Sequence, residues 1–268
     1  MITRAAVRFI ERLRTLQAAP SMSDTTITRA AMPFIERLRA LKAAHPPSGF
    51  TWYGYDIMSN VWHLEGLLEG RLGHLLADVC EPIADIGAAD GDLGFFMESL
   101  GHRVDFIDWP QTNWNGLRGL RSLHGLLESS AEIHEVDVDT QFNLARERYG
   151  LVISLGILYH LKNPFYVLER LAQHSDRLLL STRIASRTPD GGRMDHAPLA
   201  YLLDPQECNQ DATNFWIFSE PGLRRLLERS GWRVEAWRSV GCTVDSEPAH
   251  PDRDERAFVY ARSLHAAP

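Results

Sequence analysis

The sequence contains little of what several protein classes require. Among its 268 residues are only three cysteines, Cys80, Cys208 and Cys242, which lie far apart and include no CxxC pair. This spacing argues against a disulfide framework or a metal site, and it predicts buried thiols in a reducing compartment. No run reaches the roughly 18 apolar residues that span a bilayer, and Arg and Glu stand where a signal peptide needs an apolar core. We therefore expect a cytoplasmic protein with no membrane partner and no metal.

Positive charge is also scarce. The chain has 28 Lys and Arg against 35 Asp and Glu, for a net charge of -7, so it offers no broad basic surface to phosphate backbones. Nucleic acid is therefore disfavoured as a partner, and only a local basic groove would support it. The hydrophobic share of 44% is ordinary for a globular protein with one large core. These features do not specify an oligomeric state.

The N-terminal part of the chain contains a duplication. Residues 2–19, ITRAAVRFIERLRTLQAA, and 27–44, ITRAAMPFIERLRALKAA, are identical at 14 of 18 positions with a period of 25. Each copy has one apolar stripe at helical spacing, which in the second comprises Phe34, Ile35, Leu38 and Leu41, and two copies are too few for a solenoid. We interpret residues 1–49 as a helical extension without chemistry. Met22 is an alternative first residue, and Pro33 suits the first turn of the second helix.

The main domain is expected to cover residues 50–268, after the break HPPSG at 45–49. It begins with one amphipathic helix whose apolar positions are Val61, Leu64, Leu67, Leu68 and Leu72. Alternating apolar residues then predict strands near 82–86, 103–107, 132–137, 150–155 and 177–182, with helices near 92–100, 114–128 and 164–174. We expect Asn163 and Pro164 to begin the last of these helices, and a further helix to lie between Ser219 and Gly231. Strands near 232–239 and 256–262 are expected to form an antiparallel hairpin, so the pattern predicts a doubly wound, mostly parallel α/β sheet.

The stretch IADIGAADGDLG places an acid and a glycine turn at the end of the first strand. Asp85, Gly87 and Gly91 form a DxGxxxG pattern, in which Ala88 follows the first glycine. In an open parallel sheet this turn lies beneath the ligand, and glycine lets the backbone approach that ligand closely or take positive φ. Dinucleotide folds favour GxGxxG instead. The turn's carboxylates would repel a pyrophosphate and suit a ligand with amino and sulfonium charges: Asp85, Asp90 and Asp92.

The next two strands also end in acids. Asp108 follows the glycine turn by about twenty residues, where a carboxylate can accept both hydroxyls of a ribose. Asp137 ends the third strand and would accept from an adenine amine while Val138 packs on the ring, with Asp139 as the competing acid. Residues after the ribose acid are expected to edge the same pocket: Trp109, Asn113 and Trp114.

Together these motifs resemble a known family. IADIGAADG, VDFIDW, EVDVD and YGLVISLGILYHLKNPFYVLERLA are similar in order and spacing to class I S-adenosylmethionine-dependent methyltransferases, over roughly residues 50–262. GILYHLKNP and TNFWIFSEPGLRRLLERSGW resemble the branch that contains the tRNA wobble-uridine carboxymethyltransferase and its uncharacterised relatives. The resemblance implies a Rossmann-like sheet of seven strands with its last hairpin reversed. It also implies S-adenosylmethionine as cofactor, bound over Asp85, Gly87, Gly91, Asp108 and Asp137. The chain departs from the family at Gly150, where an acid is usual.

The fourth strand leads into four residues that we expect at the reaction centre. Leu155 and Gly156 would lie beside the methionine portion of the donor, and Tyr159 and His160 would face the acceptor. A histidine can take a proton from an attacking hydroxyl, since its unperturbed pKa is about 6.5. The alternative is that His160 only fixes the loop. Because the donor is strongly activated, alignment alone can supply much of the rate.

Aromatic and amide side chains are expected to enclose the acceptor. A connection at about 185–218 is long enough to form a lid and contributes Tyr201, Asn214 and Trp216, beside Phe215. Trp52 and Tyr53, with Tyr55, would close the N-terminal side. Such an enclosure suits a planar or partly apolar small molecule, although aromatic clusters also serve as plain core.

The sequence thus predicts a methyltransferase that acts on a small-molecule acceptor at oxygen. An RNA-modifying enzyme is the first alternative. A protein that binds S-adenosylmethionine without turnover is the second, and a nicotinamide oxidoreductase is the third.

Overall fold

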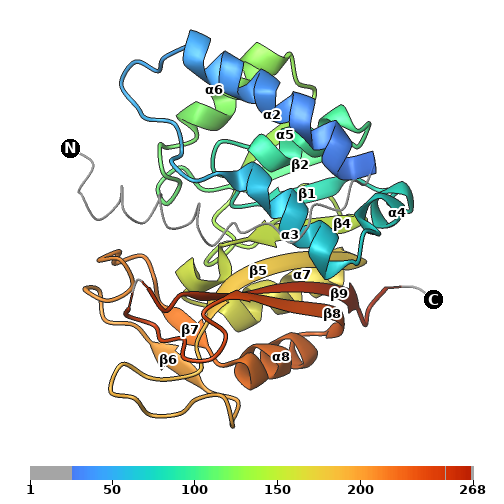
Figure 1. The fold of residues 1–268 in the computed structure, drawn as a ribbon. Coiled ribbons are helices and arrows are strands. Elements are labelled where there is room, and N and C mark those ends of the chain that lie inside the picture. The colour runs from blue at the N-terminus through green and yellow to red at the C-terminus, as the bar shows by residue number, and fades with distance from the viewer. Residues whose placement is uncertain (1–25, 251, 267–268) are drawn as a thin grey trace. The chain divides into compact units, whose positions relative to one another are not determined.

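The structure, a computed structural model, describes residues 26–250 and 252–266. Figure 1 shows the elements in chain order. The chain divides into two compact units between Ile153 and Ser154, and each unit is considered by itself below. The first copy of the duplication and Met22 lie outside the described residues, and the domain boundary at 49/50 stays a prediction.

The second copy of the duplication forms helix α2 (Thr26–Ala44). Its apolar stripe is buried at Phe34, Ile35 and Leu38, while Leu41 is half-buried. Helix α2 packs against α3 (Asn60–Leu67), α4 (Leu72–Ala77) and α5 (Asp92–Ser99) of the same unit (Figure 1). The rings of Phe34 and Phe96 have centroids 5.5 Å apart. The amphipathic spacing therefore predicted this helix and its buried face correctly.

Pro33 lies inside α2 and not in its first turn, so that prediction was wrong. An interior proline removes one backbone hydrogen bond and costs about 3 kcal/mol relative to alanine. The helix nevertheless extends N-terminal to Pro33 because that part is packed. Ala31 is fully buried, and Ile27 is 7% exposed. The Ile27 side chain lies so close to α4 that a Cβ atom added at Gly73 would be 3.2 Å from it.

The single helix expected through residues 61–72 is instead two short helices. All five apolar residues of the predicted stripe are buried, so the pattern of burial was right. The chain breaks after α3 because Glu69 and Gly70 take φ angles of 53° and 81°, which lie in the left-handed region. The short 3-10 helix η1 (Ile57–Ser59) precedes α3.

The first unit contains a parallel sheet in the strand order β3-β2-β1-β4. The strands are β1 (Ile83–Ile86), β2 (Val104–Asp108), β3 (Glu132–Glu135) and β4 (Leu151–Leu155). Ile83 pairs with Val104 on one side and with Leu151 on the other, so β1 is central. Helix α5 connects β1 to β2, and α6 (Arg118–Leu127) connects β2 to β3. The predicted strand and helix alternation is confirmed.

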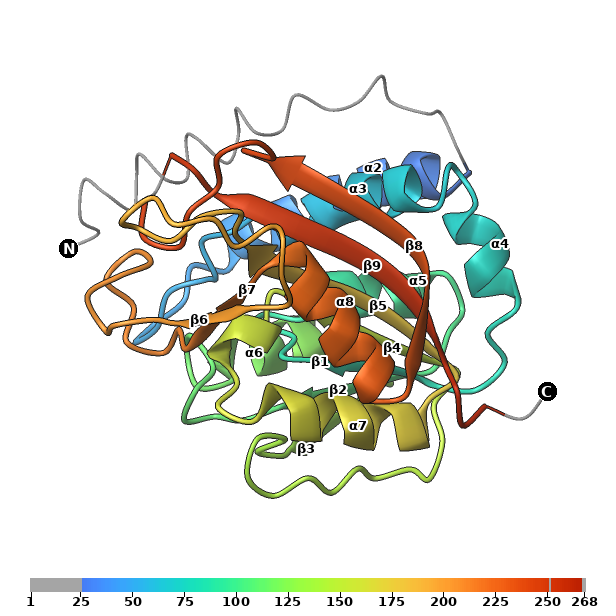
Figure 2. The same ribbon diagram turned by 90° about the horizontal axis from the view of Figure 1, so that it is seen from below.

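The second unit contains a mixed sheet. Strand β9 (Glu255–Ser263) pairs antiparallel with both β5 (Arg177–Ile184) and β8 (Trp232–Gly241), and therefore lies between them (Figure 2). Helix α8 (Glu220–Arg229) packs against β8 and against α7 (Pro164–His174). The expected α/β class with a mostly parallel sheet and an antiparallel C-terminal hairpin is confirmed.

Helix-start signals were correct at α8 and only partly correct at α7. The Ser219 hydroxyl accepts a bond from the Gly222 amide at 3.0 Å, and Gly231, with φ of 91°, follows the end of α8. Pro164 is the first residue of α7, as expected. Asn163 holds the N-cap position, but its side chain makes no capping bond to the helix.

The connection at about 185–218 has structure of its own. It contains two short strands that the sequence pattern did not predict, β6 (Ala200–Leu202) and β7 (Trp216–Phe218), which pair with each other. A small core gathers five buried residues, with Tyr159 and Tyr201 packed beside it: Ala185, Met194, Leu203, Cys208 and Ile217. Within residues 26–250 and 252–266, no helix has the length and apolar character needed to cross a membrane.

Candidate functional site

The turn after β1 depends on backbone conformations that favour glycine. Gly87 and Gly91 have φ angles of 69° and 85°, and Ala89 between them has 55°. The Gly87 amide donates to the Ile107 carbonyl at 2.9 Å, so the turn is tied to the end of β2. A side chain at Gly87 would be strained by the left-handed backbone. Of the two reasons expected for glycine here, positive φ is confirmed at both positions, and the close approach of a ligand stays a prediction.

Gly91 and the following Gly94 are required by internal packing. A Cβ atom at Gly91 would lie 2.5 Å from the side chain of Leu120. One at Gly94 would lie 2.2 Å from Phe106 and 2.8 Å from Asp85 Oδ2. Helix α5 therefore approaches β2 and the Asp85 carboxylate as closely as a backbone can. This contact with the protein's own side chains is a sufficient reason for glycine at both positions.

Two buried carboxyl groups lie at the ends of β1 and β2. Asp85 is 6% exposed, and burial, reinforced by the charge of Asp108, raises its pKa to about 7, although a bond from the Gly94 amide opposes this. Burial also raises the pKa of Asp108 to about 6, against bonds from Asn113 and from the Trp109 and Ala89 amides. Buried acids with raised pKa values are frequent at functional sites, because a ligand can supply the missing positive charge or donors.

Asp108 is oriented by residues on both sides of it. Its Oδ1 accepts from the Trp109 amide at 2.7 Å, and its Oδ2 accepts from Asn113 Nδ2 at 2.8 Å. The same Asn113 amide donates to the Ala89 carbonyl at 3.1 Å, so it joins the acid to the glycine turn. A carboxylate has about four lone-pair sites, and because three of them are taken by Asn113 and by the Trp109 and Ala89 amides, about one remains for a ribose hydroxyl.

The Asp90 carboxylate is buried and bonded to three protein groups, so it is not accessible to a ligand. It is 1% exposed. Its oxygens accept from the Tyr53 amide at 2.7 Å, from Asn115 Nδ2 at 2.8 Å and from Lys42 Nζ at 3.3 Å. Tyr53, predicted to line the acceptor pocket, is thus fixed through its backbone.

Lys42 of α2 neutralises the acidic turn. Its Nζ lies 2.9 Å from Asp92 Oδ2, and it also lies 5.4 Å from the centroid of the Trp52 ring. The side chains of Lys42 and Asp92 are only 18% and 13% exposed. Two of the three carboxylates in the turn are therefore engaged by protein groups, which leaves Asp85 to act with Asp108. Lys42 was not predicted from the sequence, although Gln17 occupies its position in the first copy and the difference was a visible signal.

Asp137 lies in a turn beyond the end of β3. Its carboxylate accepts from the Asp139 amide at 3.1 Å and from the Thr140 hydroxyl. Val138 is 8% exposed. These local bonds order the turn, and the adenine contacts assigned to Asp137 and Val138 stay predictions.

An open hollow in the first unit is bordered by Phe50, which precedes β1, and by Trp114, which follows β2. Its volume is about 410 Å³, and it is lined by Gly49, Phe50, Thr51, Trp114, Asn115 and Arg118. Trp114 is 61% exposed. Trp52 and Tyr53 do not line the hollow, but the Tyr53 ring lies 6.2 Å from that of Trp114. Phe50 and Arg118 were not predicted, because neither belongs to a motif.

In the second unit, Gly156 and Tyr159 lie close to Arg256. Gly156 has φ of 77°, and its amide donates to the Ser181 carbonyl at 2.8 Å. A Cβ atom added there would lie 3.4 Å from Arg256 Nη1 and 3.8 Å from the Tyr159 hydroxyl. Leu155, the last residue of β4, is half-buried. The left-handed backbone and these neighbours together favour glycine at position 156.

His160 follows Tyr159 in the 3-10 helix η2 (Leu158–His160). The two rings have centroids 4.3 Å apart. Its Nδ1 lies 3.1 Å from both the carbonyl oxygen and the Oγ1 of Thr213. Burial lowers the pKa of His160, the Thr213 carbonyl and Asp211 oppose this, and Arg256 adds to it. The net shift of the pKa is downward from 6.5, which favours the neutral ring, and a neutral imidazole can accept a proton.

The other residues predicted to bind the acceptor have structural contacts. Tyr201 donates to Glu207 Oε1 at 2.9 Å, and Trp216 Nε1 donates to the Lys162 carbonyl at 3.3 Å. Asn214 is 4% exposed and donates to the Cys208 carbonyl at 2.9 Å. That bond holds a turn in which Cys208, Asn209 and Gln210 all have positive φ. These contacts within the protein account for the positions of Tyr201, Asn214 and Trp216. The role of the three residues in binding an acceptor stays a prediction.

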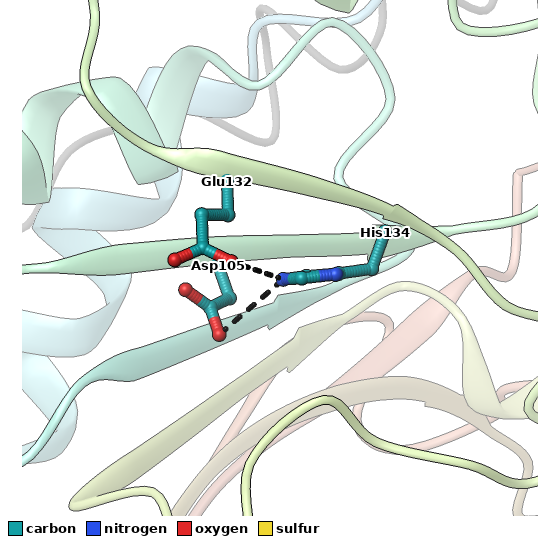
Figure 3. Close-up of side chains that lie close together, drawn as sticks. All are labelled: Asp105, Glu132 and His134. Carbon is teal, nitrogen blue, oxygen red and sulfur yellow. Dashed lines mark ion pairs between the residues drawn. The ribbon is translucent and has the colours of Figure 1, made fainter.

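A cluster that offers metal-ligand atoms is instead an ion-pair network. His134 Nε2 lies 3.5 Å from Asp105 and 3.4 Å from Glu132. Figure 3 shows the three side chains, with dashed lines from His134 to both acids. Arg146 already pairs with both carboxylates at 2.7 Å, and the Tyr149 hydroxyl donates to Asp105 at 2.9 Å. Because a guanidinium supplies the positive charge, the carboxylates have no need of a metal cation.

No family model matches the sequence. Among solved structures, this chain is similar to the N-terminal domain of EvdMO1 with S-adenosylhomocysteine bound. The alignment covers 85% of this chain and 96% of the EvdMO1 domain, with 18% sequence identity and a TM-score of 0.53. The [4+2]-cyclase SpnF is similar over 90% of this chain and 98% of its own, with 12% identity and a TM-score of 0.53. This chain is also similar to the PH0226 protein from Pyrococcus horikoshii. The alignment covers 75% of this chain and 90% of PH0226, with 14% sequence identity and a TM-score of 0.51. At these identities the likeness establishes the fold.

Proposed function

We propose that this chain is an S-adenosylmethionine-dependent methyltransferase that acts on a small-molecule acceptor at oxygen. The observation that carries the proposal is the pair of buried acids, Asp85 and Asp108, at the glycine turn. Both have raised pKa values, and they suit a ligand that brings positive charge and hydroxyl groups to the strand ends. The similarity to EvdMO1, whose structure holds S-adenosylhomocysteine, supports the same ligand.

Some residues of the turn and of the neighbouring strand ends would contact the donor directly. Asp85 would accept from its amino group, and Asp108, held in place by Asn113, would accept from a ribose hydroxyl. Gly87 would let the backbone approach, with Ala88 and Trp109 beside the ligand. Asp137 and Val138 would hold the adenine. The donor supplies an electrophilic methyl group on a sulfonium centre, and the chain's own residues orient it.

The alternatives differ in what the protein would bind. SpnF, a cyclase with this fold, illustrates that the fold alone does not define the reaction. An RNA-modifying enzyme therefore stays as the first alternative, although a net charge of -7 disfavours it. A protein that binds S-adenosylmethionine without turnover stays as the second. A cytoplasmic location and the tRNA-enzyme branch also stay predictions.

Ligand binding by the purified protein separates these functions. Calorimetry should show binding of S-adenosylmethionine and S-adenosylhomocysteine, and no binding of NAD. A screen of small hydroxylated acceptors and of RNA with methyl-labelled donor then identifies the product. Binding of NAD without S-adenosylmethionine would overturn the proposal. Donor binding with no product from any acceptor would favour a binding protein.

The raised pKa values predict that donor binding depends on pH. A ligand ammonium group favours the charged form of Asp85, so binding below about pH 7 must release a proton. Affinity for S-adenosylhomocysteine should therefore fall as the pH is lowered through 7 and 6, approaching about tenfold per unit for one group. Calorimetry in buffers of different ionisation enthalpy measures the released proton. 5'-Methylthioadenosine lacks the ammonium group and is the control, because its binding should release fewer protons.

Replacement of His160 distinguishes a base from a residue that only shapes the loop. If His160 takes the acceptor's proton, His160→Ala should keep donor affinity and lower kcat by about 100-fold or more, since proton transfer contributes about 10²–10⁴-fold. It should also remove the acidic limb of the pH–rate profile. His160→Asn can keep a positioning hydrogen bond but cannot take a proton at neutral pH. Near-normal turnover in His160→Asn would rule out obligatory base catalysis by His160.

A further inference from the structure

Three polar residues of the second unit form a hydrogen-bonded chain that ends on His160. Asp211 Oδ1 accepts from the Thr213 amide at 2.9 Å and from the Thr213 hydroxyl at 2.6 Å. His160 Nδ1 lies 3.1 Å from Thr213 Oγ1 and 3.1 Å from the Thr213 carbonyl oxygen. Asp211 and Thr213 belong to the loop between β6 and β7, and neither was singled out from the sequence.

The direction of these bonds fixes which nitrogen of His160 carries the proton. A threonine hydroxyl has one hydrogen, and here it is directed to Asp211. Thr213 Oγ1 can therefore only accept from His160, and a carbonyl oxygen can only accept as well. Nδ1 must be the donor, so the neutral ring has its lone pair on Nε2.

We propose that Asp211 and Thr213 are positioning residues that hold His160 in its Nδ1–H tautomer and so make Nε2 the proton acceptor in the reaction. The inference rests on the proposed function, because it assigns the protonation state needed by that reaction. Asp211 acts through Thr213 and does not touch the reacting atoms. The arrangement follows the general logic by which a third group orients a catalytic base.

The charges around His160 explain why Asp211 is needed. Arg256 from β9 and the burial of the ring both disfavour the protonated imidazole, whereas Asp211 and the Thr213 carbonyl favour it. The Tyr159 ring also lies beside His160, with the two ring centroids 4.3 Å apart. Without Asp211, only the Thr213 carbonyl would stabilise the protonated ring against the effects of burial and Arg256. Asp211 thus stabilises the imidazolium that forms when Nε2 takes a proton.

The methyl transfer that this arrangement serves forms two bonds and breaks two. The acceptor hydroxyl oxygen forms a bond to the donor's methyl carbon while the sulfur–methyl bond breaks. The electron pair of the broken bond goes to sulfur, which gives S-adenosylhomocysteine. The hydroxyl proton leaves oxygen for His160 Nε2, and Nδ1 keeps its own proton and its bond to Thr213.

Nitrogen-15 NMR of histidine-labelled protein tests the tautomer without any acceptor. His160→Gln identifies the resonances of His160 among those of the 11 histidines. We expect the Nδ1–H tautomer in the neutral ring, and a lower pKa for His160 in Asp211→Asn, whose amide oxygen can still accept from Thr213. Thr213→Ser keeps the hydroxyl and should match the wild type in both readings. An Nε2–H tautomer, or an unchanged pKa in Asp211→Asn, would overturn the proposal.

Calorimetry with S-adenosylhomocysteine separates this proposal from the proposed function. Asp211→Asn and Thr213→Ser should bind it as the wild type does, because neither residue contacts the donor in the proposal. If the wild type fails to bind it, the proposed function fails, whereas the NMR reading still decides the tautomer. If the wild type binds it but shows the Nε2–H tautomer, only the positioning role fails.

Discussion

Lys42→Met should destabilise the protein by about 3 kcal/mol, the lower end of the range for removing one partner of a buried ion pair. Asp90 is 1% exposed and Asp92 13%, so the substitution leaves two neighbouring carboxylates without their cation. Urea unfolding at pH 7 measures the loss. The cost should shrink at lower pH, because the pKa of Asp92 is already raised by burial and protonation removes the unpaired charge.

Arg39→Met is the matched control for Lys42→Met. Arg39 lies on the same helix and pairs with Asp56 at 3.6 Å, but both side chains are exposed, at 69% and 44%. Exposed pairs contribute about 0–1 kcal/mol, so this variant should unfold close to the wild type. Equal unfolding midpoints for the two variants would show that the buried Lys42 contacts contribute no more to stability than the exposed Arg39 pair.

The duplication allows the same residue to be tested by exchange of the copies. Deleting residues 2–26 keeps the copy with Lys42, and deleting residues 20–44 keeps the copy with Gln17 at the matching position. The second deletion should be the less stable of the two, and Gln17→Lys within it should restore part of the difference. No recovery would mean that other differences between the copies, such as Pro33 against Arg8, decide the outcome.

Gly87→Val should remove detectable binding of S-adenosylmethionine. The branched side chain would occupy the space in which the ligand approaches the turn, and the φ of 69° would be strained. That strain costs about 1–2 kcal/mol, so some loss of fold stability accompanies the loss of binding.

Gly101→Val separates the two effects of the Gly87 substitution. Gly101 has φ of 96°, and no neighbouring atom would lie within 4 Å of a Cβ atom added there. The variant should therefore lose stability through the backbone alone and keep its affinity for the donor. Unchanged affinity in Gly87→Val would remove this turn from the ligand site.

The fold could be predicted from the sequence because its signals are local. Alternating apolar residues located the seven main strands. Ser219, whose hydroxyl caps the helix, and Gly231, which takes positive φ, marked the two ends of α8. The two short strands β6 and β7 were missed because three residues are too few for a period to be visible. The break at Glu69 and Gly70 was missed because the apolar spacing continues through it.

The candidate site was predictable only where an acid or a glycine ends a strand. Asp85 and Asp108 were found in this way, and both prove to be buried with raised pKa values. Lys42 and Asp211 were missed because neither belongs to a sequence motif. Their contacts with Asp92 and Thr213 form only in the folded chain. On an amphipathic helix, a lysine such as Lys42 has the pattern of a solvated face.

The polar cluster around Asp105 has a consequence for solubility. Within the described residues β3 pairs only with β2, so its other side is a free sheet edge that another chain could extend. Glu132 and His134 place charged or ionisable groups along that edge, and Arg146 anchors Glu132 to the buried Asp105. Charges on an edge strand discourage edge-to-edge pairing of sheets. We therefore expect the network to disfavour edge-to-edge pairing through β3, an effect that is independent of any ligand.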